Sequence, residues 1–320
     1  MGKKVRICFH DRCFDGTSSA AVFSRFYRER VDPEAEFHYR GLVHQPAGTV
    51  IDPEMFDGEE NVIVDFKYSP SPRLTWWFDH HQSAFLSPED AEHFRGDRSG
   101  RKFYDPSYKS CTKFLSQVAR EQFGFDPEPL RELIQWADII DGAQYENPEA
   151  AVKMNVPATQ LALVIEASRD DRLTTRLIPD LARRPLGEVV QRPDVAEHFQ
   201  ELYRRHQSSM EVLRRRIEYE RGVVYFDIAD QPLEGYNKFI PYYLYPDCVY
   251  SVGVSRSPQR IKVAVGSNPW KLPEEGKNLA SLCERYGGGG HARVAAISFE
   301  PDQGERARQA GREIAEELRR

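Results

Sequence analysis

The sequence predicts an α/β protein of two domains, in which an amino-terminal domain with a parallel sheet is joined by a long helix to a smaller carboxy-terminal α/β domain. Its 320 residues, of which 40% are hydrophobic, are enough to bury two cores. In the first third, short apolar runs alternate with helical stretches, which is typical of βαβ units. Residues 194–221 lack glycine and proline, and strand patterns return after them. We therefore expect domains at residues 1–193 and 222–320, with residues 194–221 as the linking helix.

The first domain begins with the pattern of a parallel sheet. The predicted strands and first helix are residues 5–10 (strand), 15–30 (helix), 37–42, 62–66 and 74–78 (strands). Residues 62–64, Val-Ile-Val, form a continuous apolar run, as expected where both faces of a sheet are covered. Apolar side chains at helical spacing within residues 114–118, 130–140 and 161–165 predict helices that pack around this sheet.

The linking helix and the second domain follow from the same kind of spacing. Residues 194–221 carry apolar side chains three and four positions apart, which predicts one long helix. The apolar runs that follow predict strands at residues 223–228, 249–254, 261–265 and 294–299. A helix at residues 279–286 precedes the last of these strands, and a charged helix ends the chain.

Composition limits the kinds of partner. Lys and Arg number 44 and Asp and Glu 50, so the net charge of -6 argues against long nucleic acid as the main partner. The apolar run after Lys3 and Lys4 is too short for a signal peptide or a membrane span, so we expect a cytoplasmic protein with no membrane partner. The five cysteines are scattered without CxxC spacing, which argues against a disulfide framework or a structural zinc site.

Acidic residues and histidines gather where the predicted strands and helices of the first domain end. They lie in four segments: His10-Asp11-Arg12-Cys13-Phe14-Asp15-Gly16, Asp65, Asp79-His80-His81, and Asp138 with Asp141. Because the carboxyl ends of parallel strands meet at one edge of a sheet, these side chains should converge. Converging carboxylates and imidazoles are costly to bury unless a cation neutralises them. We therefore predict a divalent metal site, whose oxygen and nitrogen ligands suit manganese, iron or zinc better than calcium.

The four segments differ in how strongly they indicate function. Asp15 alone could simply begin a helix, because Asp is a good helix N-cap, and Asp65 at a strand end is unremarkable by itself. The adjacent ionisable groups of Asp79-His80-His81 follow an apolar Trp-Trp-Phe strand, so each of them needs a partner. Asp138 and Asp141 lie near a helix carboxyl terminus, where the helix dipole disfavours negative charge, so at least one of them should have a compensating cation.

The second domain offers a candidate phosphate site. Four glycines at residues 287–290 precede His291 and Arg293, and their backbone N–H groups could approach an anion closely. A flexible loop is the alternative, but the two side chains that follow at once favour phosphate binding. Arg256-Ser257, at the end of the strand at residues 249–254, is a second candidate contact, although a single Arg in a turn is often simply exposed.

The four segments of the first domain that carry acidic residues and histidines resemble, in their order along the chain, the motifs of the DHH phosphoesterase superfamily. This superfamily is named after the triplet found here as Asp79-His80-His81. Residues 10–16, 62–65 and 136–141 correspond to its first, second and fourth motifs. The glycine run with His291 resembles the signature of the carboxy-terminal domain of RecJ-type exonucleases and nano-RNase-like enzymes. The resemblance spans nearly the whole chain and implies a hydrolase of phosphoric ester bonds.

The resemblance also implies a two-metal site, and the residues that match the family's metal ligands are His10, Cys13, Asp15, Asp65, His80 and Asp138. Asp65 would bridge the two ions, with His10 and Cys13 on the second. Most relatives have Asp at the position of Cys13, which predicts a second site that is weaker or softer in its metal preference. Asp11 and Asp141 are the alternatives left open in the first and fourth motifs. The implied cofactor is Mn²⁺, as one or two ions, with Mg²⁺ or Co²⁺ as substitutes.

For catalysis, the resemblance implies that Asp79 orients an imidazole and that His81 faces the substrate phosphate. The residues implied in substrate binding are Arg256, Ser257, Gly288, Gly289, Gly290 and His291. Together these roles imply hydrolysis of a small phosphodiester, a short oligonucleotide or a nucleotide-like phosphoester by a metal-activated water, in the manner of an exonuclease.

Two other functions stay open. One is a phosphohydrolase of polyphosphate or pyrophosphate, and the other is a nucleotide-binding sensor without turnover, for which Cys13 is the supporting feature. Aromatic platforms for bases would favour a nucleotide, and the candidates, which could equally be core, are Tyr242, Tyr243, Tyr245 and Trp270. A homodimer is a further expectation, to which the linking helix could contribute.

Overall fold

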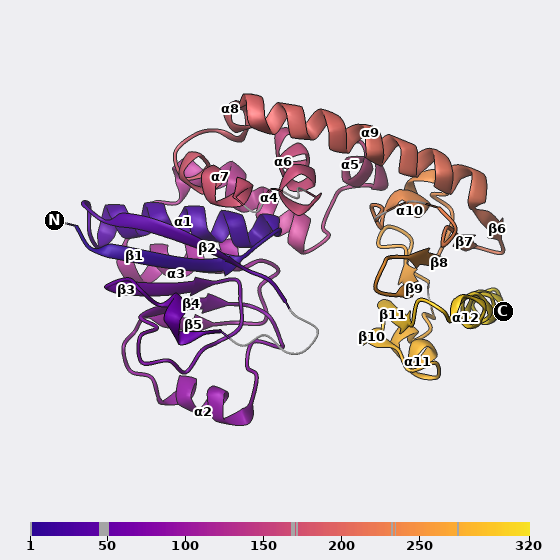
Figure 1. Ribbon diagram of the computed structural model, residues 1–320, viewed down its shortest axis with the longest axis horizontal. Helices are drawn as coiled ribbons and strands as arrows, with labels where there is room; N and C mark the ends of the chain where they lie inside the picture. Colours follow the sequence, from indigo (N-terminus) through magenta and orange to yellow (C-terminus); the bar gives the residue numbers. More distant parts are fainter. Residues whose placement is uncertain are drawn as a thin grey trace. The chain divides into compact units, whose positions relative to one another are not determined.

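This computed structural model describes residues 2–44, 51–167, 170, 172–231, 233, 235–273 and 275–320. The chain divides into two compact units, the amino-terminal unit (Met1–Tyr145 and Met154–Leu202) and the carboxy-terminal unit (Glu146–Lys153 and Tyr203–Arg320). Each unit has its own sheet, and helix α9 (Pro193–Arg216) runs from one unit into the other (Figure 1). The predicted α/β class, with two sheet-containing parts joined by a long helix, is confirmed.

Within the described residues, the amino-terminal unit is built on five parallel strands in the order β2-β1-β3-β4-β5. These strands are β1 (Lys4–His10), β2 (Glu36–Leu42), β3 (Glu60–Val64), β4 (Trp76–Asp79) and β5 (Lys102–Tyr104). The first four match the predicted strands closely, and β5 is an addition. Because β1 lies between β2 and β3, the strand order reverses there. Open α/β sheets bind ligands beside such a reversal, at the carboxyl ends of the strands.

The two faces of this sheet are covered differently. Alternate side chains of β1 point to opposite faces, so Ile7 and Phe9 pack against helices while Cys8 packs on the other side. The helices of the first face are α1 (Phe14–Arg30), α3 (Cys111–Phe123), α4 (Arg131–Asp141), α6 (Pro157–Ala167), α7 (Leu173–Leu181) and α8 (Leu186–Val189). On the second face, Trp77 of β4 packs edge-to-face on Phe94 of α2 (Pro88–Gly96). Figure 1 shows α1 and α2 on opposite sides of the sheet.

As far as the structure describes it, the carboxy-terminal unit has a mixed sheet of six strands in the order β10-β11-β9-β8-β7-β6. These are β6 (Glu218–Glu220), β7 (Val223–Asp227), β8 (Tyr250–Arg256), β9 (Ile261–Ser267), β10 (Gly289–His291) and β11 (Val294–Phe299). Its helices are α5 (Pro148–Val152), α10 (Ile240–Leu244), α11 (Leu279–Glu284) and α12 (Gly304–Leu318), of which α12 packs across β7, β8 and β9. In the described ranges, no helix of either unit combines the length and the apolar character needed to cross a membrane.

The linking helix is shorter than predicted. We expected it to reach residue 221, but α9 ends at Arg216, and Glu218–Glu220 form β6. β6 pairs with β7 through a turn at Arg221 and Gly222, whose φ angles are 46° and 77°. Two successive left-handed residues suit the tight turn of a β-hairpin, and glycine adopts this conformation freely. The charged residues before the turn are compatible with a helix end or with an exposed edge strand, so the pattern alone could not place the boundary.

Candidate metal centre

Seven side chains of the amino-terminal unit gather at the carboxyl edge of its sheet, beside the reversal of strand order. They are His10, Cys13, Asp15, Asp65, His80, His81 and Asp141. They form three overlapping groups, and within each group the ligand atoms lie within 4.8 Å of one another. We name two parts of this cluster: the carboxylate subsite (Asp15, Asp65, His80 and Asp141) and the thiol subsite (His10, Cys13 and Asp65). The structure therefore brings together five of the six predicted metal-ligand residues, all except Asp138.

The turn between β1 and α1 places three of these residues. A Cβ atom at Gly16 would lie 2.2 Å from the carbonyl oxygen of His10, so glycine is needed for the helix to begin this close to the strand. Cys13 is the N-cap of α1, but its side chain makes no capping hydrogen bond. Its Sγ lies instead 3.7 Å from Oδ2 of Asp65. Burial and the nearby Asp65 carboxylate raise the pKa of the Cys13 thiol well above its usual value.

Asp15 is buried and holds the start of another helix. Its carboxylate accepts hydrogen bonds from the backbone N–H groups of Cys111 (2.6 Å) and Thr112 (3.0 Å), in the first turn of α3. It therefore stabilises the amino terminus of α3, where negative charge is favourable, instead of capping its own helix. The same carboxylate faces the cluster, with Oδ2 3.7 Å from Nε2 of His80. Burial and the charges of Asp65 and Asp141 raise the pKa of Asp15 well above its usual value.

Asp65 is the carboxylate that both subsites share. It follows β3 in a left-handed conformation, with φ of 57°, which is uncommon for a residue other than glycine and is often found at functional sites. Its Oδ2 lies 3.3 Å from Nδ1 of His10, and its Oδ1 lies 3.4 Å from Nε2 of His80. Burial acts to raise the pKa of Asp65, but the two imidazoles outweigh burial and lower the pKa below its usual value.

The Asp-His-His triplet is organised around Asp79. Oδ1 of this buried carboxylate accepts hydrogen bonds from the backbone N–H of His80 (2.9 Å) and from Nδ1 of His81 (2.7 Å). Nδ1 of His80 lies 3.2 Å from the carbonyl oxygen of Tyr108, so this nitrogen carries the proton and Nε2 is left to face the cluster. His81 is oriented in the same way through Nδ1, and 36% of its side chain is exposed.

The atoms that face one another in the cluster fit a divalent cation. Nε2 of His80 is surrounded by carboxylate oxygens of Asp65 (3.4 Å), Asp141 (3.5 Å) and Asp15 (3.7 Å). Among the described residues, the buried atoms Nδ1 of His10, Oδ1 of Asp65 and Nε2 of His80 have no hydrogen-bond partner. Two ligands held about 2.1 Å from one cation lie roughly 3.0 to 3.4 Å apart, which is close to these spacings. A cation would satisfy the orphaned atoms and offset the clustered negative charge.

In the fourth motif, the structure places Asp141 and not Asp138 beside His80. Asp138 was expected in the cluster, but its carboxylate lies 2.6 Å from Nζ of Lys113 and accepts a hydrogen bond from Ser110 Oγ (3.3 Å). Side chains three residues apart on a helix point about 60° away from each other, and here Asp141 points at the cluster while Asp138 points at Lys113. Partial burial and the charge of Asp65 raise the pKa of Asp141 to about 6.

The first motif also leaves one residue outside the cluster and one unpredicted residue near it. Asp11, the alternative to His10, accepts a hydrogen bond from Thr174 Oγ1 (2.7 Å) and belongs to none of the three groups. The exposed His44 was not predicted. Its ring stacks on Phe66 at 4.6 Å and meets the His10 ring edge-to-face at 4.9 Å. His44 follows the end of β2 at the same sheet edge, so the strand-end rule applied to that strand would have found it.

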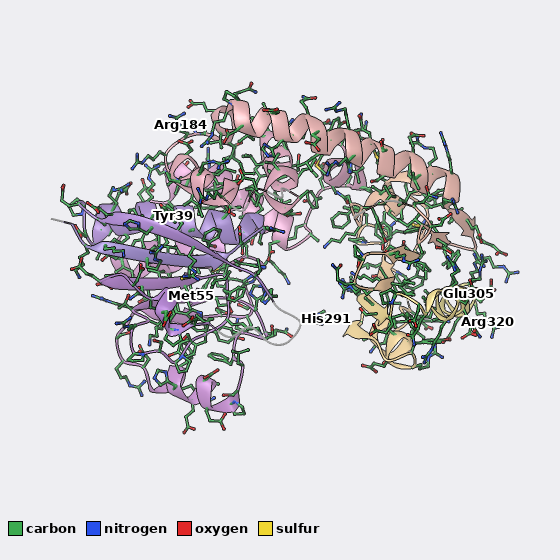
Figure 2. All side chains as sticks on the ribbon, in the orientation of Figure 1. Tyr39, Met55, Arg184, His291, Glu305 and Arg320 are labelled. Carbon is green, nitrogen blue, oxygen red and sulfur yellow. The ribbon has the colours of Figure 1, made fainter. Side chains whose placement is uncertain are left out.

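The glycine run of the carboxy-terminal unit forms an edge strand and the turn before it, and not the flexible loop that was the alternative to phosphate binding. Gly289–His291 form β10, which pairs with β11, and the N–H of Gly288 donates to the carbonyl oxygen of Cys283 (2.9 Å). A Cβ atom at Gly288 would lie 2.5 Å from a carbonyl oxygen of β11. Part of the predicted anion-binding backbone is therefore already hydrogen-bonded. The side chains of His291, labelled in Figure 2, and Arg293 are exposed.

Arg256 and Ser257 lie at the opposite end of this sheet from His291, which contradicts their grouping as one phosphate site. His291 pairs with Val294 at the start of β11. Arg256 lies level with Phe299 at the end of β11, because both residues pair with the same residue of β9. The five steps from one end of β11 to the other span ~17 Å at about 3.4 Å per residue. Arg256 and His291 therefore cannot contact the same small phosphate.

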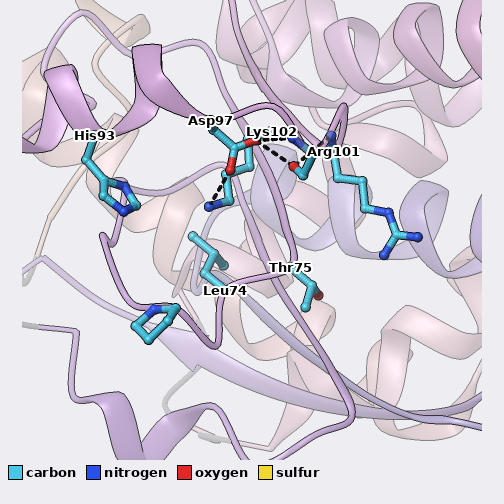
Figure 3. A pocket seen from close by; sticks show the side chains of 8 residues that line it. Leu74, Thr75, His93, Asp97, Arg101 and Lys102 are labelled. Carbon is cyan, nitrogen blue, oxygen red and sulfur yellow. Dashed lines mark hydrogen bonds and ion pairs between the residues drawn. The ribbon is translucent and has the colours of Figure 1, made fainter.

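A pocket of about 500 Å³ lies in the amino-terminal unit, away from the metal cluster (Figure 3). Its walls include Thr75, Arg101 and Lys102, which precede or begin β4 and β5. Because the strands are parallel, this is the amino edge of the sheet, opposite to the edge that carries the cluster. Lys102 is paired with Asp97 at 3.1 Å, and we assign the pocket no catalytic role.

Cation binding at the carboxylate subsite is expected to tighten as the pH rises. Burial acts to lower the pKa of His80, but the surrounding carboxylates raise it to about 10 in the metal-free protein. A cation needs the lone pair of Nε2 and must displace that proton, so the apparent affinity should rise about tenfold per pH unit between about pH 6.5 and pH 8. Equilibrium dialysis with Mn²⁺ measures this slope. His80→Ala should flatten it, and a flat wild-type profile would contradict the assignment of Nε2 as a ligand.

Solved structures with the same fold come from the DHH family. PggH, a pGpG-specific phosphodiesterase from Vibrio cholerae, is 21% identical with a TM-score of 0.68, and the match covers 96% of this chain and 97% of that chain. RecJ from Thermus thermophilus, in complex with Mn²⁺, is 15% identical with a TM-score of 0.58. That match covers 99% of this chain but 52% of RecJ. A scan against protein-family models and a search of curated proteins find no match.

A third structure extends the likeness. It is a DHH domain from a protein described as a member of a family of ribosomal proteins, and it is 14% identical with a TM-score of 0.54. The match covers 98% of this chain and 86% of that chain. All three likenesses span nearly the whole of this chain, and so include both sheets and the helix between them. They confirm the predicted resemblance at the level of the fold.

Proposed function

We propose that this chain, which has the fold of the DHH family, is a metal-dependent phosphoesterase that hydrolyses short linear dinucleotides. The observation that carries the proposal is the pair of buried atoms Oδ1 of Asp65 and Nε2 of His80. Within the described residues they have no hydrogen-bond partner, yet they lie 3.4 Å apart among further carboxylates. This arrangement is costly without a cation and well suited to one. We propose Mn²⁺ as the preferred ion of the carboxylate subsite, because its ligands are mainly oxygens.

A divalent cation bound here would lower the pKa of a coordinated water and offset the charge of the phosphate. The residues of the chain supply the other parts of the reaction. Asp79 holds His81 through Nδ1 at 2.7 Å, which leaves Nε2 of this half-exposed ring available to a substrate oxygen. Burial acts to lower the pKa of His81, but Asp79 raises it and so favours the protonated form. We propose that this proton stabilises a phosphate oxygen or the leaving oxygen as the P–O bond breaks.

The dinucleotide substrate is inferred from two facts. The fold is shared along nearly the full length of both chains with a phosphodiesterase described as pGpG-specific. The net charge of -6 disfavours tight binding of long nucleic acid but permits a small anion whose charge is offset by metal ions. For the carboxy-terminal unit, we propose that the exposed His291 and Arg293, with Gly289 and Gly290, contribute contacts to substrate phosphate.

The proposal is tested with the full chain, depleted of metal and then supplied with Mn²⁺, Mg²⁺ or Co²⁺. The substrates are pGpG, pApA, RNA oligomers of increasing length, polyphosphate and a bis-aryl phosphodiester. We expect Mn²⁺-dependent release of mononucleotide from the linear dinucleotides, with kcat/KM at least about tenfold above that for longer oligomers, a difference of about 1.4 kcal/mol. A chelator should abolish the activity.

Two outcomes would contradict the proposal. Cleavage of polyphosphate with no cleavage of any dinucleotide would support the phosphohydrolase alternative. Tight binding of a dinucleotide to the Mn²⁺-loaded chain without turnover would support a nucleotide sensor. Calorimetry on the same preparations separates binding from turnover, so the two outcomes can be told apart.

A further inference from the structure

The two subsites of the cluster offer different ligand chemistry. The carboxylate subsite presents three carboxylates and one imidazole nitrogen. The thiol subsite presents one imidazole, one thiol and the shared carboxylate of Asp65. Oxygen ligands suit hard cations such as Mg²⁺ and Mn²⁺, whereas sulfur ligands favour softer ones such as Zn²⁺. One protein therefore holds side by side two groups of ligands with opposite preferences.

The geometry of the thiol subsite is that of a binding group. Oδ2 of Asp65 lies 3.3 Å from Nδ1 of His10 and 3.7 Å from Sγ of Cys13. Ligands of one tetrahedral Zn²⁺ ion, at about 2.0 Å for nitrogen or oxygen and about 2.3 Å for sulfur, lie roughly 3.3 to 3.5 Å apart. Nδ1 of His10 is buried and, among the described residues, has no hydrogen-bond partner. This unsatisfied ligand atom, beside the buried carboxylate of Asp65, points to an ion next to the thiol.

Cys13 also differs from the other cysteines of the chain. Cys8, Cys111, Cys248 and Cys283 are buried, as is usual for cysteine used as a small apolar side chain, but Cys13 is partly exposed. It occupies the N-cap of α1, where Ser, Thr, Asp or Asn would normally accept a backbone hydrogen bond, and it makes none. Its sulfur faces a carboxylate and an imidazole instead of an apolar core.

We propose that Cys13 is a metal ligand, and that the thiol subsite selects a thiophilic cation such as Zn²⁺ or Co²⁺ while the carboxylate subsite takes Mn²⁺ or Mg²⁺. When both kinds of ion are supplied, the cluster would then hold two different metals. Binding breaks the S–H bond, forms the Sγ–metal bond and releases the proton to solvent, so no redox partner is needed. This inference shares one assumption with the proposed function, namely that the cluster binds cations.

The test uses the full chain, depleted of metal and titrated with Co²⁺ in the presence of excess Mg²⁺. A cobalt–thiolate bond gives sulfur-to-metal charge-transfer absorption in the near ultraviolet, so the band reports Cys13 as a ligand without any turnover. We expect the band in the wild type and in the control Cys248→Ala, and its loss in Cys13→Ser. Zn²⁺ affinity should fall in Cys13→Ser by at least about 10- to 100-fold. Losing a residue that only hydrogen-bonds to a metal ligand already has an effect of this size.

Equilibrium dialysis completes the test. Mn²⁺ binding to the carboxylate subsite should change by less than about threefold in Cys13→Ser, because Cys13 is not one of its ligands. Cys13→Asp should lose the Co²⁺ band and gain a second bound Mn²⁺. The inference is overturned if Co²⁺ binds to the wild type without the band, or if Cys13→Ser keeps the same preference for Zn²⁺ over Mn²⁺. A band without hydrolysis of any substrate would refute the proposed function alone, and hydrolysis without the band would refute this inference alone.

Discussion

Replacing Asp65 by Asn is expected to lower kcat/KM with Mn²⁺ by about 10³-fold or more, which is a loss of about 4 kcal/mol of transition-state stabilisation. Asp65 is the carboxylate shared by both subsites, with Oδ2 beside His10 and Oδ1 beside His80. Asn keeps the size of the side chain but removes its charge and turns one ligand oxygen into an amide NH₂ group. The variant should therefore weaken both metal positions together. Steady-state kinetics and metal content after dialysis measure the two effects.

The fold should survive this substitution, because Asn tolerates the left-handed φ of 57° at this position as well as Asp does. Asp57→Asn is a matched control. Asp57 pairs with Arg6 at the other end of β1, away from the cluster, and 45% of its side chain is exposed. We expect the control to keep normal metal content and activity. An Asp65→Asn protein with near-normal activity in added Mn²⁺ would show that the chemistry lies elsewhere.

The location of the cluster could be predicted because it follows from a rule of topology. Once the first strands are recognised as parallel, their carboxyl ends must lie along one edge, and Asp65 and His80 follow two of those ends. The order of the motifs predicted the same grouping through the family resemblance. The same rule also places His44 at this edge, after the end of β2.

The choice between Asp138 and Asp141 could not be made from the pattern. Both lie in the last turn of one helix, and which of them faces the sheet depends on how α4 is rotated against α1 and α3. That rotation is fixed by packing of apolar side chains from several helices, such as Leu133 and Ala137, and not by local sequence. The exposed Lys113 of α3 then provides Asp138 with a separate partner.

The second unit shows a different limit. The strands at residues 249–254 and 294–299 were recognised, but the pairing of strands sets which ends lie together. Arg256 and His291 each end a strand, yet the register of β8, β9, β10 and β11 puts them at opposite ends of the sheet. Register depends on long-range hydrogen bonds and on packing of both faces, and neither can be deduced from a strand alone. The same pairing makes part of the glycine run an edge strand, because Gly289–His291 pair with β11.

Asp141→Asn is expected to lower kcat/KM with Mn²⁺ by about 10²-fold, or about 3 kcal/mol, and Asp138→Asn to change it by less than about threefold. The two variants make the same substitution three residues apart on one helix, so each is the control for the other. Asp141 lies 3.5 Å from Nε2 of His80, and its loss removes one of the charges that hold a cation in the carboxylate subsite. Asp138→Asn only weakens a pair with Lys113, of which 52% is exposed, and should cost about 1 kcal/mol of stability at most.

Mn²⁺ affinity decides between these assignments independently of turnover. It should fall in Asp141→Asn and stay unchanged in Asp138→Asn, while thermal unfolding of the metal-free proteins should show a small loss only for Asp138→Asn. Removing Asp141 also relieves repulsion from Asp65 when no metal is present, so that variant should be no less stable than the wild type without metal. If Asp138→Asn were instead the variant that lost Mn²⁺, Asp138 would be the ligand. In the wild type, its carboxylate would then have to leave Lys113 when metal binds. Lys113→Ala would then raise Mn²⁺ affinity, whereas the geometry described here requires that it does not.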